Sequence, residues 1–200
     1  MAPRDKQLRM IWPERLLSSP PRPQVPEGYL LRCYRDADEA GYLELMKKAG
    51  FERWDHKRVT AIVQKVLPDG FFVIVHRASG KIVAAAMTTH NPIDLHPYGG
   101  ELGWVAAVPE HRGKGLGLAV CAQATARFIQ AGYRNIYLLT DDFRLPAIKT
   151  YLKLGYEPLL FCEGMAERWE QVYRKLGLEV PRGGFPRPAV RQLPDSPASF

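Results

Sequence analysis

A short glycine-rich stretch is the first place in this chain where the types and spacing of residues suggest chemistry. Residues 112–117 read RGKGLG, and they lie between an apolar run and a long segment with helical periodicity. The amides of a glycine-rich turn that leads into a helix are unpaired and lie at the positive end of the helix dipole, an arrangement that binds phosphate. The sequence therefore predicts a phosphate site at this turn.

Two common phosphate-binding motifs do not fit the spacing of this stretch. The P-loop needs a glycine five residues before Gly-Lys-Ser/Thr, and no such run occurs here. The dinucleotide motif GxGxxG fails because Leu118 stands where the third glycine should be. The pattern [RQ]xxGx[GA] does fit, with Arg112, Gly115 and Gly117 at its defined positions.

A second motif follows about thirty residues later, where residues 147–158 read AIKTYLKLGYEP. The two motifs, in this order and with the strand-like NIYLLT between them, resemble the two signatures of GNAT N-acetyltransferases, with Tyr151, Gly155 and Tyr156 at the defined places of the second. The resemblance covers roughly residues 29–162, and the sequence around the second motif is most similar to that of bacterial members related to mycothiol synthase. It implies an α/β (α+β type) GNAT fold, a mixed central sheet of about six to seven strands flanked by helices.

The resemblance also implies a reaction, the transfer of an acetyl group from acetyl-CoA directly to an amine of a small molecule or a peptide, without a metal. Such a reaction needs a base, an oxyanion donor and an acid. Glu101 is the first candidate for the base because it begins the strand ELGWVAAV, where several members of the family that the chain resembles hold a glutamate that acts on the amine, often through water. An exposed strand-end carboxylate is the alternative. Asp141 and Asp142 stay open as bases or as N-caps of the next helix. Tyr151 matches the family's tyrosine near the CoA sulfur, which would make it the acid, with simple core packing as the alternative.

The cosubstrate would lie along the strand and the glycine-rich turn, with main-chain amides around the pyrophosphate and an oxyanion donor on the strand. The predicted cofactor-binding residues are Val105, Ala106, Ala107, Arg112, Gly113, Lys114, Gly115, Leu116, Gly117 and Leu118. One position departs from the family pattern, because Arg144 stands where many relatives carry an asparagine that contacts the pantetheine. Arg144 could reach a CoA phosphate or an anionic substrate group, or it could be solvated. Phe51 and Trp54 could line a substrate groove or anchor a solvated helix face.

Hydrophobic periodicity gives the elements that would position these residues. It predicts strands over residues 29–35, 71–77, 81–90, 101–108, 135–140 and 156–162, and helices over residues 36–50, 54–67, 116–132, 143–155 and 164–177. The GNAT domain would span residues 29–178. After Cys162 the family usually adds a seventh strand, whereas this chain reads as a helix.

The two ends of the chain differ from its middle. Residues 1–28 and 181–200 carry +4 of the net charge of +7 and 11 of the 17 prolines. They predict a proline-rich basic N-terminal arm (residues 1–28) and a proline-rich C-terminal tail (residues 179–200) with little regular structure. Solvated tails explain the charge more simply than nucleic-acid binding does. A basic nucleic-acid-binding protein and a catalytically idle acyl-CoA sensor remain the alternative functions.

The remaining composition narrows the setting. The three cysteines form no CxxC pair and the five histidines show no metal-ligand spacing, so neither disulfides nor a metal site is expected. No apolar run approaches the roughly 18 residues of a membrane span, and the first residues lack the apolar core of a secretory signal. A cytoplasmic protein without a membrane partner is expected, and a homodimer stays open.

Overall fold

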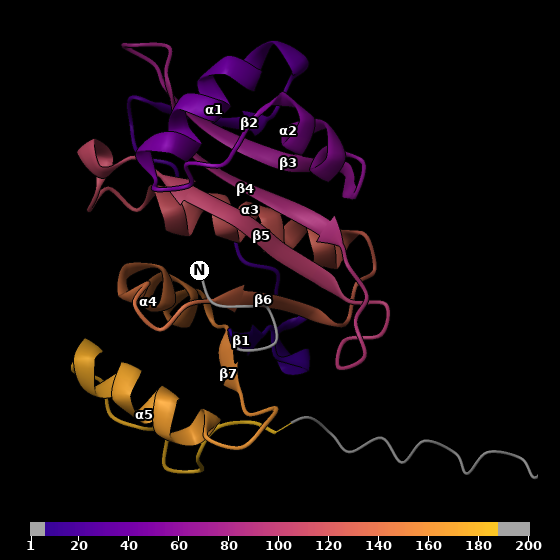
Figure 1. Cartoon of the computed structure of the whole chain (residues 1–200), viewed down its shortest axis with the longest axis vertical. Coiled ribbons are helices and arrows are strands. Elements are labelled where there is room, and N and C mark those ends of the chain that lie inside the picture. Colours follow the sequence, from indigo (N-terminus) through magenta and orange to yellow (C-terminus); the bar gives the residue numbers. More distant parts are fainter. Residues whose placement is uncertain (1–6, 188–200) are drawn as a thin grey trace, which may run out of the picture.

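The computed structural model describes residues 7–187 and shows a seven-stranded mixed sheet in the order β2-β3-β4-β5-β6-β1-β7 (Figure 1). The strands are β1 (Leu8–Ile11), β2 (Tyr29–Cys33), β3 (Val66–His76), β4 (Ile82–His90), β5 (Gly100–Ala107), β6 (Ile136–Thr140) and β7 (Glu157–Leu159). Strands β5 and β6 run parallel, and every other neighbouring pair is antiparallel. The predicted fold class, a mixed sheet of six to seven strands with flanking helices, is confirmed.

Within residues 7–187, five α-helices and three 3-10 turns cover and connect the strands. They are α1 (Glu39–Lys48), α2 (His56–Val63), α3 (Leu116–Gln130), α4 (Leu145–Leu154) and α5 (Met165–Leu176), with the turns η2 (Glu14–Leu16), η3 (Asp36–Asp38) and η4 (Pro109–His111). Helix α3 packs on β3, β4 and β5, and α1 packs on β4 and β5 (Figure 1). Helix α4 packs against both α3 and α5. The stripe that the sequence predicts on α3 faces this core, since Leu116, Val120, Ala124 and Phe128 are all buried.

The N-terminal segment differs from the prediction of an arm with little regular structure. Residues 8–11 form β1, which is antiparallel to both of its neighbours, with Leu8 opposite Thr140 on β6 and Arg9 opposite Leu159 on β7. Buried and partly exposed side chains alternate along residues 8–11, with Leu8 and Met10 fully buried. This alternation is too short to be recognised as a strand in a basic, proline-rich stretch. The first six residues of the predicted arm lie outside the described residues.

The C-terminal side of the domain shows how the seventh strand is supplied. After β7 the chain enters α5 instead of another strand, as the sequence indicates, and β1 supplies the strand between β6 and β7. Part of the predicted C-terminal tail also packs on the domain. The ring of Phe185 lies 5.2 Å from that of Tyr173, and the main-chain N–H of Leu160 donates to the carbonyl of Pro186 (2.8 Å). Residues 188–200 of the tail lie outside the described part of the chain.

The boundary predicted between the helix over residues 54–67 and the strand from residue 71 is wrong, and the strand expected to reach residue 162 ends at Leu159. Helix α2 ends at Val63, and Val66 already pairs with Thr89 in the sheet. The apolar spacing of residues 59–66 suits a helix, but pairing with β4 satisfies the main-chain polar groups of Val66 and its neighbours. Tertiary strand pairing therefore overrides the local periodicity here.

Two irregularities of β5 create the space that matters for function. Strands β5 and β6 pair only at Gly100 with Ile136 and at Glu101 with Tyr137, after which no pairing joins them. On its other side, β5 contains a bulge where its register with β4 shifts. Trp104, within this bulge, has a left-handed backbone (φ 52°). A bulge bends its strand and redirects side chains, so β5 leaves β6 and opens a gap in the middle of the sheet.

Candidate active site

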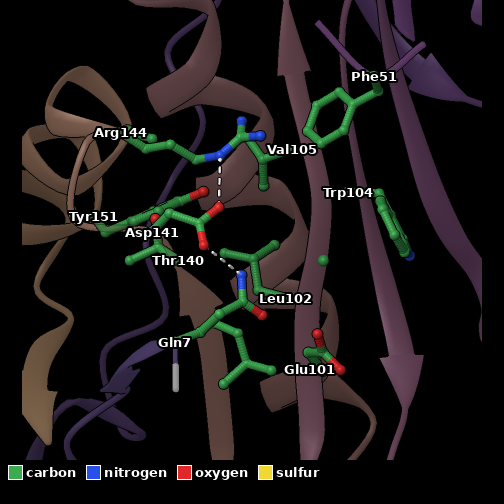
Figure 2. A pocket seen from close by; sticks show the side chains of 13 residues that line it. Gln7, Phe51, Glu101, Leu102, Trp104, Val105, Thr140, Asp141, Arg144 and Tyr151 are labelled. Carbon is green, nitrogen blue, oxygen red and sulfur yellow. Dashed lines mark hydrogen bonds and ion pairs between the residues drawn. The ribbon is translucent and has the colours of Figure 1, made fainter. Parts of the chain in front are cut away.

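A cavity of about 90 Å³ lies where β5 and β6 separate (Figure 2). Its lining comprises Gln7, Phe51, Glu101, Leu102, Gly103, Trp104, Val105, Leu139, Thr140, Asp141, Arg144, Ala147 and Tyr151. These residues come from the N-terminal segment, the loop after α1, both separating strands and α4. The structure thus brings Glu101 and Tyr151, the two predicted catalytic residues, to one cavity.

Glu101 lies on β5 with its carboxylate held by a neighbouring amide. The Nδ2 of Asn91 donates to Oε2 of Glu101 (2.5 Å), and the hydroxyl of Tyr137 donates to the main-chain oxygen of Asn91 (2.6 Å). Thr89 on β4 donates its hydroxyl to the main-chain oxygen of Glu101 (2.9 Å). These contacts fix both the strand and the side chain, so the carboxylate of Glu101 has a set position at the cavity wall.

Tyr151 reaches the cavity from α4 and is buried for most of its surface. Burial raises the pKa of its hydroxyl well above the usual value for tyrosine, and the nearby Cys121 thiol adds to this effect. The hydroxyl is therefore protonated throughout the neutral pH range. A protonated hydroxyl at a cavity wall can donate a hydrogen bond to a group bound there.

The two adjacent aspartates after β6 have different surroundings. Asp141 is 2% exposed and binds two side chains: Nε2 of Gln7 donates to its Oδ1 (3.1 Å), and Nε of Arg144 donates to its Oδ2 (3.3 Å). Asp142 points to α5, where Arg168 donates to it from Nε (3.0 Å) and from Nη2. This guanidinium lowers the pKa of Asp142. Asp142 does not line the cavity.

Neither aspartate plays the capping role that the sequence left open. Arg144 is the N-cap residue of α4, and no side-chain hydrogen bond caps this helix. Asp141 instead joins Gln7 to Arg144 in a set that we call the buried polar chain (Gln7, Asp141 and Arg144), drawn with its dashed contacts in Figure 2. It gives the cavity one fixed cation beside a buried carboxylate.

Aromatic rings form the wall of the cavity next to Arg144. The guanidinium carbon of Arg144 lies 4.7 Å from the ring centre of Phe51. The ring of Trp104, presented by the bulge in β5, lies 6.2 Å from Phe51 and 4.7 Å from Trp54. Phe51 and Trp104 line the cavity, whereas Trp54 does not line it and packs edge-on against Trp104. Stacking on an aromatic ring holds a guanidinium without using its N–H donors.

The predicted phosphate site, which we call the glycine loop (residues 112–118), connects η4 to α3. Gly113 (φ 77°) and Gly115 (φ 75°) have left-handed backbones, a conformation that L side chains rarely adopt. Within residues 7–187, no heavy atom beyond the adjacent residues lies within 4 Å of the place where a Cβ would sit on either glycine. Their backbones thus face open space at the N-terminus of α3, where Gly115 is the N-cap residue. This arrangement, with Arg112 and Lys114 beside it, fits a pyrophosphate.

Strand β5 connects the cavity to the glycine loop. Val105 lines the cavity, and residues 106 and 107 lead to η4 and the loop. The side chains of Ala106 and Leu116 are buried in the core, so these two predicted cofactor-binding residues could contact a ligand only through their main chains. An extended ligand that follows β5 would thus meet main-chain groups first and the glycine loop last.

Gln7, Trp104 and Thr140 line the cavity but were not singled out from the sequence. Gln7 contacts Asp141 across 134 residues, and no local feature of the sequence predicts such a contact. Within residues 7–187, no group of three or more His, Cys, Asp and Glu side chains could hold a metal ion. None of the helices in this same range is long and apolar enough to cross a bilayer.

Comparisons with known proteins agree with this architecture. The model of the acetyltransferase (GNAT) family matches residues 30–156. A mycothiol acetyltransferase from Saccharomonospora viridis is 28% identical over 151 residues, covering 68% of this chain and 48% of that protein. One from Thermobispora bispora is 30% identical over 165 residues, covering 74% and 54%. The chain spans about half the length of these curated relatives.

Solved structures show the same fold. A GCN5-related N-acetyltransferase from Sphaerobacter thermophilus superposes with a TM-score of 0.57 at 23% identity, over 76% of this chain and 49% of that one. The family match includes β2 to β6, the glycine loop and most of the second motif. It thereby covers more than half of the sequence, and the chain belongs to the GNAT family of acetyltransferases.

Proposed function

We propose that this chain transfers an acetyl group from acetyl-CoA directly to a primary amine of a small molecule or a peptide. One observation carries the proposal: the glycine loop and the cavity of Glu101 and Tyr151 lie at the two ends of the stretch of β5 that has no pairing with β6. A phosphate cradle, an open strand and two proton-handling groups are what this reaction requires. The name of the curated relatives supports acetyl transfer, while their acceptor is not assigned to this chain.

Glu101 and Tyr151 would divide the proton chemistry between them. As the new C–N bond forms, the carboxylate of Glu101 takes the proton that the attacking amine loses. As the C–S bond breaks, the hydroxyl of Tyr151 donates its proton to the leaving sulfur, which departs as the CoA thiol. Asp141 is less suited to the role of base, because Gln7 and Arg144 each donate to one of its oxygens. Asp142 is engaged by Arg168 outside the cavity.

Main-chain groups would hold the cosubstrate. The amides of residues 113–118 surround the pyrophosphate, with Arg112 and Lys114 adding positive charge. The main chain of residues 105–107 accepts the uncharged arm, and an N–H of this strand stabilises the oxyanion that forms during the attack. Because these contacts use the backbone, they depend on the conformation of β5 and of the loop more than on particular side chains.

Replacing the hydroxyl of Tyr151 tests the proposed chemistry. We expect Tyr151→Phe to lower kcat by about 100-fold or more, the usual contribution of a positioned acid, with an unchanged KM for acetyl-CoA. Turnover is measured as thiol release from acetyl-CoA with a panel of primary amines. Tyr156→Phe is the matched control: it removes a buried hydroxyl that contacts Thr125 (2.9 Å). It should cost about 1 kcal/mol of stability and leave kcat unchanged.

Two results would contradict the proposal. Wild-type kcat in Tyr151→Phe would remove the acid role of this residue. If acetyl-CoA binds but no amine raises thiol release above the blank, the chain is an acyl-CoA-binding module and not a transferase.

A further inference from the structure

Arg144 is held in the cavity by contacts that leave the end of its side chain available. Its Nε donates to Asp141, and its guanidinium stacks on Phe51 at 4.7 Å and on Phe143 at 5.6 Å. Asp141 is itself fixed by Gln7 from the N-terminal segment. These contacts set the plane of the guanidinium through groups from three different parts of the chain.

The two terminal nitrogens of Arg144 have no hydrogen-bond acceptor within residues 7–187. Figure 2 shows them on the side of the guanidinium that faces away from Asp141. The side chain is 28% exposed, so the fork is partly enclosed and still reachable. A guanidinium fixed through Nε presents two parallel N–H groups, which match the two oxygens of a carboxylate.

The charges of the cavity favour a single negative charge at this fork. The cavity lining holds one cation, Arg144, and two carboxylates, Asp141 beside it and Glu101 on β5, so its charge already leans negative. A carboxylate adds one negative charge, whereas a phosphate dianion would add two next to Asp141. The CoA pyrophosphate already has a binding place at the glycine loop, and the pantetheine arm carries no charge that would require an arginine.

We propose that Arg144 binds a carboxylate of the acceptor, and that the acceptor is a small amino-acid-like molecule with both a primary amine and a carboxylate. The inference rests on the proposed function. Arg144 and Glu101 line the same cavity, so the acceptor carboxylate pairs with the guanidinium while its amine faces the carboxylate of Glu101. The rings of Phe51 and Trp104 contact the carbon skeleton between these two groups.

A matched acceptor panel tests this assignment. The panel contains α-, β-, γ- and ε-amino acids, each paired with its carboxamide and with the corresponding aminoalkyl phosphate, and the readouts are kcat/KM for thiol release and the acetyl-CoA Kd. In the best pair, the wild-type protein should prefer the carboxylate over the carboxamide by at least about tenfold, as expected for charge-assisted hydrogen bonds. The phosphate analogue should be a poorer acceptor than the carboxylate.

Three variants assign the preference to one side chain. Arg144→Met should bring the carboxylate-to-carboxamide ratio close to one with an unchanged acetyl-CoA Kd, and Arg144→Lys should keep only part of the ratio because lysine lacks the planar fork. Arg168→Met is the matched control. Its side chain is also 28% exposed and also pairs with an aspartate, but it lies outside the cavity. It should keep the full ratio.

The possible results separate this inference from the proposed function. Equal use of carboxamides and carboxylates by the wild-type protein would overturn the inference and leave amine acetylation intact. A weaker acetyl-CoA Kd in Arg144→Met with an unchanged acceptor ratio would overturn it by assigning Arg144 to the cosubstrate. If acetyl-CoA binds and no panel member is acetylated, both the proposed function and the inference fail. Should Arg144→Met not fold, the wild-type ratio and the Arg144→Lys variant still decide.

Discussion

The glycine loop and the buried polar chain are the regions proposed to bind the two substrates, acetyl-CoA and the acceptor, and they are built in opposite ways. The loop is a continuous segment whose proposed binding groups are main-chain amides, presented by two left-handed glycines. The buried polar chain consists of three side chains, from the N-terminal segment, the end of β6 and the start of α4. The proposed site for the cosubstrate lies within one short segment of the sequence, whereas the proposed site for the acceptor combines residues that are far apart in the sequence.

The N-terminal segment, which supplies Gln7 to the buried polar chain, also contacts the second motif of the sequence. Gly155, in the second motif, has φ 118°, and a Cβ there would lie 3.0 Å from Leu16 and 3.5 Å from Trp12. The ring of Trp12 also meets that of Tyr156 edge-on at 5.2 Å. The segment that supplies Gln7 is therefore anchored on the motif that supplies Tyr151.

The largest expected effect separates the loop from the rest of the protein. We expect Gly115→Glu to weaken acetyl-CoA binding by about 100-fold, because it places a strained backbone and a negative charge at the proposed phosphate cradle. Calorimetric titration with acetyl-CoA measures this change. Gly80→Glu is the matched control, since Gly80 also has a positive φ (66°) and no atom near a Cβ position. It should lose stability and keep the acetyl-CoA affinity, and an unchanged affinity in Gly115→Glu would remove the phosphate role of the loop.

A smaller effect tests the buried polar chain. We expect Gln7→Leu to lower kcat/KM for the acceptor by about tenfold while the acetyl-CoA affinity stays the same, because Asp141 then loses a donor and holds Arg144 less firmly. Steady-state kinetics with each substrate varied in turn measures both quantities. The comparison uses Arg9→Met, also in the N-terminal segment, whose guanidinium lies 4.1 Å from the ring centre of Phe161 and not in the cavity. Equal losses in the two variants would mean that strand docking, and not the contact with Asp141, is responsible.

The smallest expected effect concerns His96, which lies in neither region and makes the free energy of unfolding depend on pH. Burial lowers the pKa of His96 to about 4, whereas the unfolded chain has the usual value near 6.5. Between these values the unfolded state binds a proton that the folded state does not. The free energy of unfolding should therefore fall by roughly 1–3 kcal/mol as the pH drops through this window, and be fully retained above it.

Urea denaturation across this pH range measures the effect of His96. We expect His96→Phe to flatten the slope, since a phenyl ring can keep the stacking on Tyr137 (4.1 Å) without titrating. A slope identical to that of the wild-type protein would show that other groups cause the acid sensitivity.

Part of the candidate site could be predicted from the sequence because its requirements are local. A left-handed residue at the start of a helix favours glycine, so the pattern of residues 112–117 predicts both the conformation and the ligand class. Tyr151 and Glu101 could be placed by their position within a helix and a strand, and both do line the cavity. Their catalytic roles, like the phosphate role of the loop, stay predictions that the variants above address.

The sequence could not separate the two aspartates that follow β6. Asp141 and Asp142 are adjacent and chemically identical, yet the residue Asp141 is 2% exposed in the cavity whereas the side chain of Asp142 is 39% exposed and paired with α5. The difference depends on which partners approach from elsewhere in the chain, Gln7 for the first and Arg168 for the second. No property of residues 141 and 142 themselves contains that information.

By itself, the sequence determined the family, the fold class and the glycines whose conformation follows from local backbone geometry. Only the tertiary structure decided that residues 8–11 form a strand between β6 and β7, that Gln7 meets Asp141 across 134 residues, and that Arg144 lines the cavity. The physical reason is the range of the forces involved. The left-handed conformation of the glycine loop depends on its residues and their immediate neighbours, whereas a strand pairing or a buried side-chain contact exists only once the fold has excluded water and brought both partners together.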